Sequence, residues 1–186
     1  MKSHNYPEGL VIDGDMVLAC PVELMPVELP RTPQSEKMPL DDKFEREFHL
    51  QQEVDHIDPQ SRRMVWARNS LTIYDVMHRG EYAGGLLLSL IKPEFARQAI
   101  IGHVELLKQT QGKRLGVAAI VAAQLELPDD YQLVPSVPMS PSGEGLMKVM
   151  EELGLAYKER GKIRDGGQEW PSYRFLQLQR SNDLRT

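Results

Sequence analysis

The clearest repeating pattern of apolar positions lies in the C-terminal stretch from Ser140 to Gln179. Ser140 followed by Pro141 predicts a helix start, because a serine oxygen accepts free backbone N–H groups and proline fits the first turn. Gly154 predicts the helix end, because glycine adopts the left-handed C-terminal conformation without strain. Between them, apolar residues recur three and four positions apart and predict one buried stripe, made of Leu146, Val149, Met150 and Leu153.

Two strands are expected after this helix. Leu155 to Tyr157 predicts the first, and Tyr173 to Leu178 predicts the second. A charged, glycine-rich turn from Arg164 to Gln168 separates them. Helix, glycine stop, strand, turn and strand together predict a packing unit, which by itself specifies no chemistry.

A second hairpin is predicted in the middle of the chain. Residues 71–77 are rich in β-branched and aromatic types, His78 to Glu81 read as a tight reversal, and residues 82–91 return as an apolar strand. Gly84 and Gly85 within the returning strand predict a bulge or a close backbone approach. Crowding by a packed helix and contact with a ligand both explain these glycines.

The next segments predict a helix followed by a buried strand. Residues 93–113 begin with proline, carry Gly112 as a stop, and place apolar residues at helical spacing. Residues 115–123, LGVAAIVAA, are wholly apolar and predict a central strand, with helix as the alternative because of the alanines. Residues 126–139 contain three prolines and predict a loop with a short strand at 131–134.

The N-terminal part predicts a hairpin and an extended arm. Residues 10–12 and 16–19 flank an Asp13-Gly14 turn, and five prolines between positions 21 and 39 predict an extended connector or an arm that wraps a neighbouring subunit. We therefore divide the chain into this segment, 1–40, and an α/β domain, 41–186. The domain opens with a helix that ends before Pro59; it carries two histidines but no metal-binding spacing, so no metal site is predicted.

Composition narrows the class of protein. The chain has 186 residues, 41% hydrophobic and 26% charged, as expected for one soluble domain. A net charge of −5 argues against a nucleic-acid partner, and Cys20 is the single cysteine, so no intrachain disulfide can form. The N-terminus lacks a signal-peptide pattern, and no apolar run reaches the roughly 18 residues that cross a bilayer. These features predict a cytoplasmic protein without a membrane partner.

Three stretches resemble one family. IYDVMHRGEYAGGLLLSL is similar to the second and third strands of the GNAT acyltransferase superfamily, PEFARQAIIGHVELL to its pyrophosphate loop and following helix, and GLMKVMEELGLAY to its late helix with a Leu-Gly motif. The resemblance covers residues 70–178. It implies a single α/β domain with a mixed, largely antiparallel central sheet flanked by helices.

The resemblance also implies acetyl-CoA as cofactor. The family binds the CoA pyrophosphate with consecutive backbone N–H groups at a helix N-terminus, in a loop of the form Q/R-x-x-G-x-G/A. The corresponding residues here are Arg97, Gln98, Ala99 and Gly102, although isoleucines stand where small residues are expected. A second glycine pair, Gly143 and Gly145, also precedes a helix; we interpret it as the entry to the last helix.

Catalytic candidates follow from the chemistry that the family performs. Acetyl transfer to an amine requires a base for the amine and an acid for the departing thiolate. The family often places a tyrosine in the late helix; here the nearest is Tyr157, on the following strand. His103 in the middle of the chain and Glu81 near the hairpin turn are the other candidates.

Two functions of different class follow. The first is a GNAT-like N-acyltransferase that moves an acetyl group from acetyl-CoA to an amine on a small molecule or protein. The alternative is a catalytically inactive protein of the same fold that serves as a structural or interaction component, such as a bacteriophage virion protein. The proline-rich arm would suit a homo-oligomer or larger assembly. A host-directed inhibitor with an acidic face is a third reading.

Overall fold

The computed structural model describes residues 6–26, 69–91, 96–136, 139–165 and 168–181. The predicted helix that ends before Pro59, and the proline-rich arm beyond Pro26, lie outside these residues. The described part contains two α-helices, α3 (Leu115–Glu126) and α4 (Pro141–Glu152), and a short 3-10 turn, η2 (Lys108–Thr110). Its strands are β1 (Val11–Asp13), β2 (Met16–Ala19), β3 (Val22–Pro26), β4 (Asn69–His78), β5 (Glu81–Ile91), β6 (Gln98–Leu106), β7 (Gln132–Pro135), β8 (Ala156–Asp165), β9 (Gln168–Phe175) and β10 (Gln179–Arg180).

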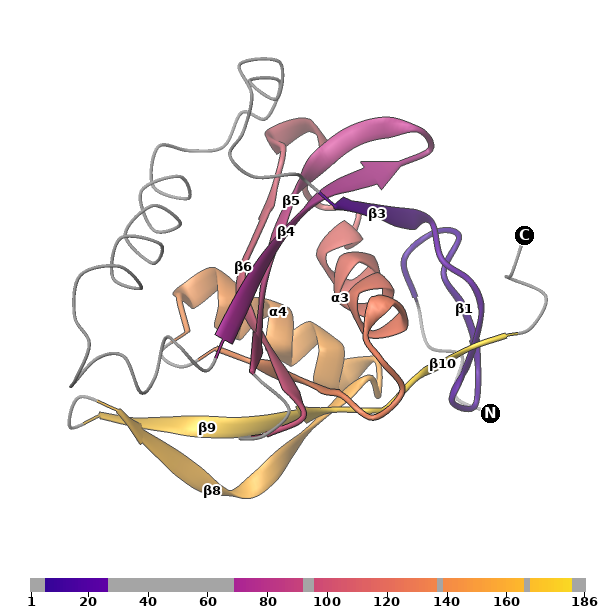
Figure 1. Ribbon diagram of the computed structural model, residues 1–186. Coiled ribbons are helices and arrows are strands. Elements are labelled where there is room, and N and C mark those ends of the chain that lie inside the picture. The colour runs from indigo at the N-terminus through magenta and orange to yellow at the C-terminus, as the bar shows by residue number, and fades with distance from the viewer. Residues whose placement is uncertain (1–5, 27–68, 92–95, 137–138, 166–167, 182–186) are drawn as a thin grey trace.

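The fold class is confirmed: a mixed, largely antiparallel sheet is flanked by helices. Its five strands run in the order β3-β4-β5-β6-β7, and every pair is antiparallel except β6 and β7. α3 packs against this sheet and α4 packs beside α3 (Figure 1). The β8–β9 hairpin forms a second small sheet, and β1, β2 and β10 form a third.

The middle hairpin is confirmed. β4 pairs with β5 from Asn69–Ile91 to His78–Glu81, and the two residues between them have φ angles of 54° at Arg79 and 77° at Gly80. Two consecutive left-handed residues form the turn whose twist matches that of the flanking strands. The local sequence therefore sets the register of the whole hairpin.

The glycines of β5 mark a bulge and a close approach, as expected. The β4–β5 register shifts so that Ala83 has no opposite residue, and a Cβ added at Gly84 would clash with the carbonyl oxygen of Glu105 on β6. The crowding element is therefore a neighbouring strand. Both interpretations offered from the sequence, a packed helix and a ligand, missed this partner.

The C-terminal unit is also confirmed. Ser140 caps α4, its Oγ accepting the Gly143 N–H at 3.2 Å. At the other end Gly154 has φ 72°, and the N–H groups of Gly154 and Leu155 donate to the carbonyls of Glu151 and Met150. These two hydrogen bonds satisfy carbonyl groups that a helix end leaves without a partner.

The elements predicted between residues 93 and 123 are wrong, because strand and helix are exchanged. β6 occupies the centre of the predicted helix, and residues 115–123, predicted as a strand, form most of α3. All of residues 115–123 are buried. A helix buried on every side has no polar face, so its sequence loses the 3.6-residue period that identifies a surface helix.

The N-terminal and β7 predictions hold with one correction. The β1–β2 hairpin turns at Gly14, with φ 61°, and β7 appears within the proline-containing loop. The predicted connector is wrong at its start, because β3 pairs with β4 as the edge strand of the central sheet. Val22 and Leu24 of β3 are buried in the core beside α3.

Candidate active site

The loop between β6 and α3 is held in place by the bulge in β5. Because Ala83 lies outside the ladder, its carbonyl is free for other donors. It accepts the Leu107 N–H at 2.8 Å and the Thr110 Oγ1 hydroxyl at 3.1 Å. Thr110 also donates to the Leu107 carbonyl at 2.7 Å. One bulged carbonyl therefore anchors the beginning of the loop to the central sheet.

The loop enters α3 through two left-handed residues. Gly112 has φ 81° and Arg114, at the N-cap position, has φ 57°. No side chain caps α3, and no acidic residue lies in its first turn. The first N–H groups of a helix have no partner within the helix, and the aligned peptide dipoles leave positive charge there. This end of α3 therefore favours an anion.

A pocket of about 360 Å³ opens at this helix end. It is lined by the segment Tyr6–Glu8, by His78 and Arg79 of the β4–β5 turn, and by residues 112–115. Arg79 pairs with Glu8 at 2.7 Å, both well exposed, whereas Lys113 and Arg114 add two further positive charges. The lining therefore carries a net positive charge, which suits phosphate groups.

β7 flanks only the first half of β6. Their parallel ladder runs only from Gln98–Gln132 to Ile101–Pro135, although β6 continues to Leu106. The next residue, Gly102, is bulged, because Leu87 of β5 lies opposite His103 and Leu88 lies opposite Ile101. A bulge bends its strand and increases the local twist. β7 ends at Pro135, so it has no residue that pairs with the second half of β6.

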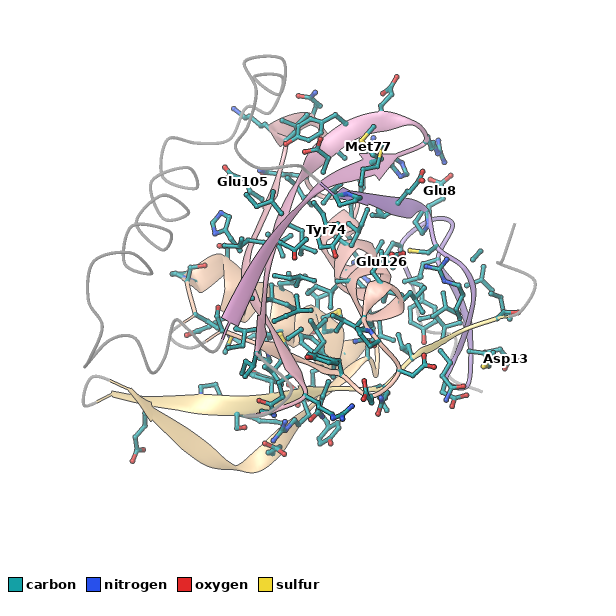
Figure 2. The ribbon with its side chains drawn as sticks, viewed as in Figure 1. Glu8, Asp13, Tyr74, Met77, Glu105 and Glu126 are labelled. Carbon is teal, nitrogen blue, oxygen red and sulfur yellow. The ribbon has the colours of Figure 1, made fainter. Side chains whose placement is uncertain are left out.

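His103 and Glu105 lie on this second half of β6. They are two residues apart, so their side chains share a face of the sheet. His103 Nε2 lies 3.5 Å from Glu105 Oε2, and the two side chains are 29% and 33% exposed. Figure 2 shows Glu105 across the sheet from Tyr74 and from Glu126 of α3. A histidine beside a carboxylate, partly open to solvent, is a suitable proton acceptor.

None of the residues predicted to hold the cofactor lies at a helix N-terminus. Gln98, Ala99 and Gly102 are in β6, and Arg97 precedes it; the helix on which that prediction rested is absent. The Arg97 carbonyl accepts the Gln132 N–H at 2.9 Å, and its guanidinium pairs with Asp130. Gly102 lies at the bulge, where an added Cβ would lie 3.0 Å from Leu87 Cδ2.

The three catalytic candidates are on different elements. Glu81 is exposed at the start of β5. Leu87, which pairs with His103, lies six residues further along β5, so Glu81 is roughly 20 Å from that position. Tyr157 is 51% exposed on β8, opposite Arg174 of β9. Of the three, His103 is the one on the half of β6 that has no β7 residue paired with it.

Sequence reasoning missed the loop of residues 108–116. The segment Gln109-Thr110-Gln111-Gly112-Lys113-Arg114 fits the form Q/R-x-x-G-x-G/A in its leading glutamine and its glycine, with an arginine in the last position. The signal was present, but it sat at the predicted end of a helix instead of before one. Once 115–123 is recognised as a helix, the same residues become a loop leading into it.

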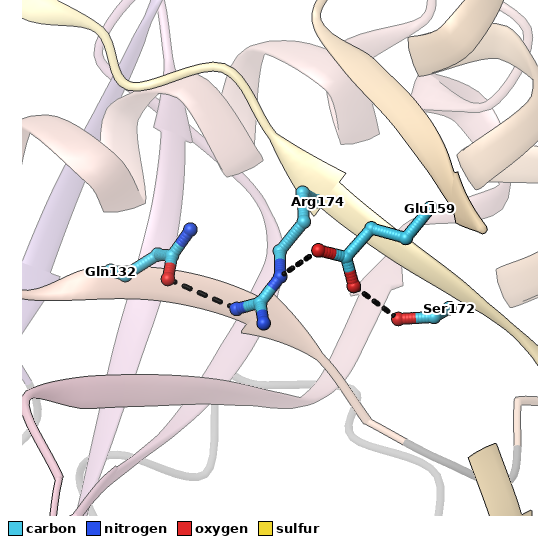
Figure 3. Close-up of polar contacts among 4 residues, drawn as sticks. All are labelled: Gln132, Glu159, Ser172 and Arg174. Carbon is cyan, nitrogen blue, oxygen red and sulfur yellow. Dashed lines mark hydrogen bonds and ion pairs between the residues drawn. The ribbon is translucent and has the colours of Figure 1, made fainter. Parts of the chain in front are cut away.

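A polar network joins the β8–β9 hairpin to the central sheet (Figure 3). Arg174 Nε donates to Glu159 Oε1 at 2.9 Å, and its Nη1 donates to Gln132 Oε1 on β7 at 3.0 Å. Ser172 Oγ donates to Glu159 Oε2 at 2.6 Å. The Ser172 hydroxyl, and then Arg174, lower the pKa of the Glu159 carboxyl. This network fixes the hairpin and supplies no proton acceptor for chemistry.

Among the described residues, no group of three or more histidine, cysteine, aspartate or glutamate side chains could hold a metal ion. Neither of the α-helices described here is long and apolar enough to cross a bilayer.

Known proteins were then compared with the chain. No protein-family model and no curated protein matches it. Among solved structures, a GNAT family acetyltransferase from Elizabethkingia anophelis with acetyl-CoA bound is 11% identical, with a TM-score of 0.47, covering 84% of this chain and 99% of that one. A tandem GNAT protein from the clavulanic acid biosynthesis pathway is 16% identical, with a TM-score of 0.37, covering 76% of this chain and 45% of that one.

Both structures are described as GNAT proteins, the family that the sequence resembles. At such low identity, function has to be judged on the residues of this chain.

Proposed function

We propose that the protein is a GNAT-like N-acyltransferase that uses acetyl-CoA to acetylate an amine on a small molecule or a protein. The carrying observation is the uncapped N-terminus of α3, which opens into a positively charged pocket at the end of the loop that follows β6. Acetyl-CoA supplies the acetyl group as an activated thioester. The residues present suit such a molecule, because its phosphates require donors and positive charge.

The loop of residues 108–114 is the proposed phosphate site. Backbone N–H groups around Gly112 and the first turn of α3 would donate to phosphate oxygens, as they do in glycine-rich anion sites. Lys113 and Arg114 are exposed beside them and would add long-range attraction. Gly112 allows the backbone to adopt φ 81°. This proposal replaces Arg97, Gln98, Ala99 and Gly102 as the primary phosphate contacts.

The second half of β6 is the proposed reaction site. His103 would accept a proton from the acceptor amine, and Glu105 beside it would stabilise the imidazolium that forms. In the transfer a C–N bond forms, the C–S bond breaks, and the thiolate must receive a proton. Tyr157 and Glu81 remain proposals for that acid, although their positions on other elements make them weaker candidates.

One observation favours the inactive alternative. Arg114 stands where the loop pattern calls for glycine or alanine, and it adopts φ 57°, a conformation that is unfavourable for a residue with a side chain. A loop that no longer binds phosphate would leave a structural or interaction protein of the same fold. Such a protein could belong to a virion or another assembly instead of acting free in the cytoplasm.

Calorimetric titration with acetyl-CoA separates the two. We expect binding in the wild-type chain and a loss of at least about tenfold in Lys113→Glu, since reversing a charge at an anion site costs about 1.4 kcal/mol or more. Lys148→Glu makes the same change on an exposed position of α4 and should bind as wild type.

Activity is then tested with His103→Ala. This variant should keep its affinity for acetyl-CoA and lose transfer to an amine panel. Absence of any binding by the folded wild-type chain would reject the enzyme and leave the structural alternative. Transfer that persists in His103→Ala would retain the cofactor site and reject His103 as the base.

A further inference from the structure

His78, the last residue of β4, lines the pocket at the start of α3. It and His103 are the two histidines among the described residues. The backbone N–H groups and the lysine and arginine side chains around this pocket carry a fixed charge, whereas a histidine gains or loses a proton between about pH 5 and 8. The orientation of this ring therefore decides how it meets an anionic ligand.

The carbonyl of Pro21 fixes the proton of one ring nitrogen. His78 Nδ1 lies 3.0 Å from the Pro21 carbonyl oxygen, which can only accept a hydrogen bond, so Nδ1 carries a proton. The position of Pro21 is itself fixed by its neighbours. The next residue, Val22, pairs with His78 in the β3–β4 ladder, and a Cβ added at Gly9 would lie 3.0 Å from Pro21 Cβ. The backbone therefore orients the imidazole of His78.

The other ring nitrogen, Nε2, is left for the pocket. The pocket lining includes His78 but not Pro21, and the two nitrogens of an imidazole point in different directions, so Nε2 points away from the Pro21 contact. Nε2 is not one of the buried polar atoms that lack a partner in the described part of the chain, so solvent reaches it. In the neutral ring it carries a lone pair, which repels a phosphate oxygen; in the imidazolium it is a charged N–H donor.

Three acidic side chains lie on the elements around His78. Glu8 of the N-terminal segment is exposed and pairs with Arg79 at 2.7 Å. Glu81 is opposite His78 in the β4–β5 hairpin and is exposed to solvent. Glu23 follows Val22 on β3, so its side chain points to the other face of that strand. Of the three, Glu8 alone lines the pocket.

Positive side chains outnumber this one carboxylate. Arg79, Lys113 and Arg114 all line the pocket. Two further titratable groups are near, Tyr6 in the lining and Cys20 beside Pro21; burial raises the pKa of both, so both stay neutral up to about pH 8. A phosphate held among these cations would favour the charged form of an imidazole in contact with it.

We propose that His78 is a phosphate-contacting residue of this pocket: as the imidazolium, its Nε2–H donates to a phosphate oxygen while its Nδ1–H remains on the Pro21 carbonyl. The inference rests on the proposed phosphate site at residues 108–114. It links binding of the phosphate-bearing ligand to uptake of one proton, so His78 strengthens binding as the pH falls through the range in which histidine gains charge. The phosphate can belong to acetyl-CoA or to a free inorganic anion.

The test measures the affinities of the full-length protein for acetyl-CoA and for inorganic pyrophosphate by calorimetry, at about pH 5.5 and about pH 8. Phosphate groups also change charge in this range, so each variant is compared with wild type at the same pH. His78→Asn places an amide N–H where Nδ1 lies, so it keeps a donor for Pro21 and loses Nε2. His78→Gln places a neutral N–H near the position of Nε2, so it can donate without titrating.

The two variants should differ in a defined way. His78→Asn should bind about tenfold more weakly than wild type at the lower pH, the size of effect expected from one charge-assisted hydrogen bond, and about equally at the higher pH. The ratio of the His78→Gln and His78→Asn affinities should be the same at both pH values. His103→Gln removes the other described histidine and should bind as wild type at both.

NMR of the ring nitrogens in 15N-histidine-labelled protein provides an independent measurement. Without ligand at the higher pH, His78 should show a protonated Nδ1 and an unprotonated Nε2. With pyrophosphate bound, Nε2 should become protonated at a higher pH than in the free protein.

Two results would overturn the proposal: a His78→Asn affinity that stands in the same ratio to wild type at both pH values, and an Nε2 resonance that does not respond to bound pyrophosphate. Failure to bind either probe would overturn it together with the proposed function. Binding of pyrophosphate that needs His78 at low pH, without binding of acetyl-CoA, would reject the acyltransferase and retain the role of His78. Binding of acetyl-CoA that is indifferent to His78 at both pH values would do the reverse.

Discussion

α3 and α4 begin in the same way in the sequence and in different ways in the structure. Each has glycine close to its start: Gly112 precedes α3, and Gly143 and Gly145 lie in the first turns of α4. α4 is capped by Ser140, whose Oγ accepts the Gly143 N–H, and Pro141 supplies its first turn. α3 starts from a left-handed Arg114, has no side-chain cap and brings Lys113 beside its first turn.

The difference teaches which helix start can serve a ligand. α4 consumes one of its own N–H groups in a cap and ends in a glycine motif that satisfies its carbonyls, so it is complete as a folding unit. α3 leaves its N-terminal donors uncapped and places positive charge around them. Glycine content does not distinguish the two helix starts, whereas the presence or absence of a side-chain cap does.

The largest expected effect on stability comes from the difference in burial between α3 and α4. Ile120 of α3 is 1% exposed, whereas Val149 of α4 is only partly buried. Ile120→Ala should lower the free energy of unfolding by about 2–5 kcal/mol, through lost apolar contact and the cavity that remains. Val149→Ala should lose clearly less. Urea unfolding of both variants measures the difference, and equal losses would contradict the central place given to α3.

The glycines at the two helix starts should respond with opposite signs. Gly112 has φ 81°, so Gly112→Ala should destabilise the fold by about 1–2 kcal/mol and weaken acetyl-CoA binding. Gly145 lies within α4 with nothing inside 4 Å of an added Cβ, so Gly145→Ala should stabilise by about 1 kcal/mol. Thermal unfolding and calorimetry on both variants check this. The same sign in both would remove the structural distinction between the loops.

Loss of the α4 cap should affect stability and leave binding unchanged. Ser140→Ala removes the acceptor for the Gly143 N–H, which is expected to cost about 1 kcal/mol. Ser140→Asp retains an acceptor and should recover most of that loss. Affinity for acetyl-CoA should match wild type in both variants. A fall in affinity with Ser140→Ala would indicate that α4 contributes to the cofactor site after all.

The smallest effect concerns pH and the hairpin that follows α4. The Ser172 hydroxyl, and then Arg174, lower the pKa of Glu159 in the folded state. Its contribution to stability is therefore fully present above the unfolded pKa of about 4.3 and is lost as pH falls through the lower folded value. Glu159→Gln should reduce stability near neutral pH and narrow its gap to wild type in acid. A gap that stays constant from neutral to acidic pH would contradict this assignment.

The sequence predicted those parts of the fold whose signals are local. The Arg79-Gly80 turn, the Ser140 cap and the Gly154 stop each depend on backbone conformations and hydrogen bonds within a few residues. The prediction failed at β6 and α3, where burial on every side removes the alternation of apolar and polar positions. His103 was proposed from its residue type, and its contact with Glu105 came only from the structure.

The candidate site could be predicted only in part for the same reason. A loop pattern around Gly112 is readable in the sequence, but it has meaning only where a strand precedes it and a helix follows. Because the prediction exchanged the strand and the helix between residues 93 and 123, it placed the phosphate site at Gly102. In the structure Gly102 lies at a bulge of β6. The uncapped helix start, the neighbouring Arg79 and the bulged Ala83 carbonyl come from segments distant in sequence.

The sequence by itself determined the hairpins, the capped helix α4 and the mixed α/β class, because turns, caps and strand alternation are short-range properties of the chain. Tertiary structure decided that 98–106 is a strand, that 115–126 is the buried helix, and that Gly102 forms a bulge against β5. Those outcomes depend on which apolar surfaces meet, and long-range packing outweighs a local preference of a few tenths of a kcal/mol per residue.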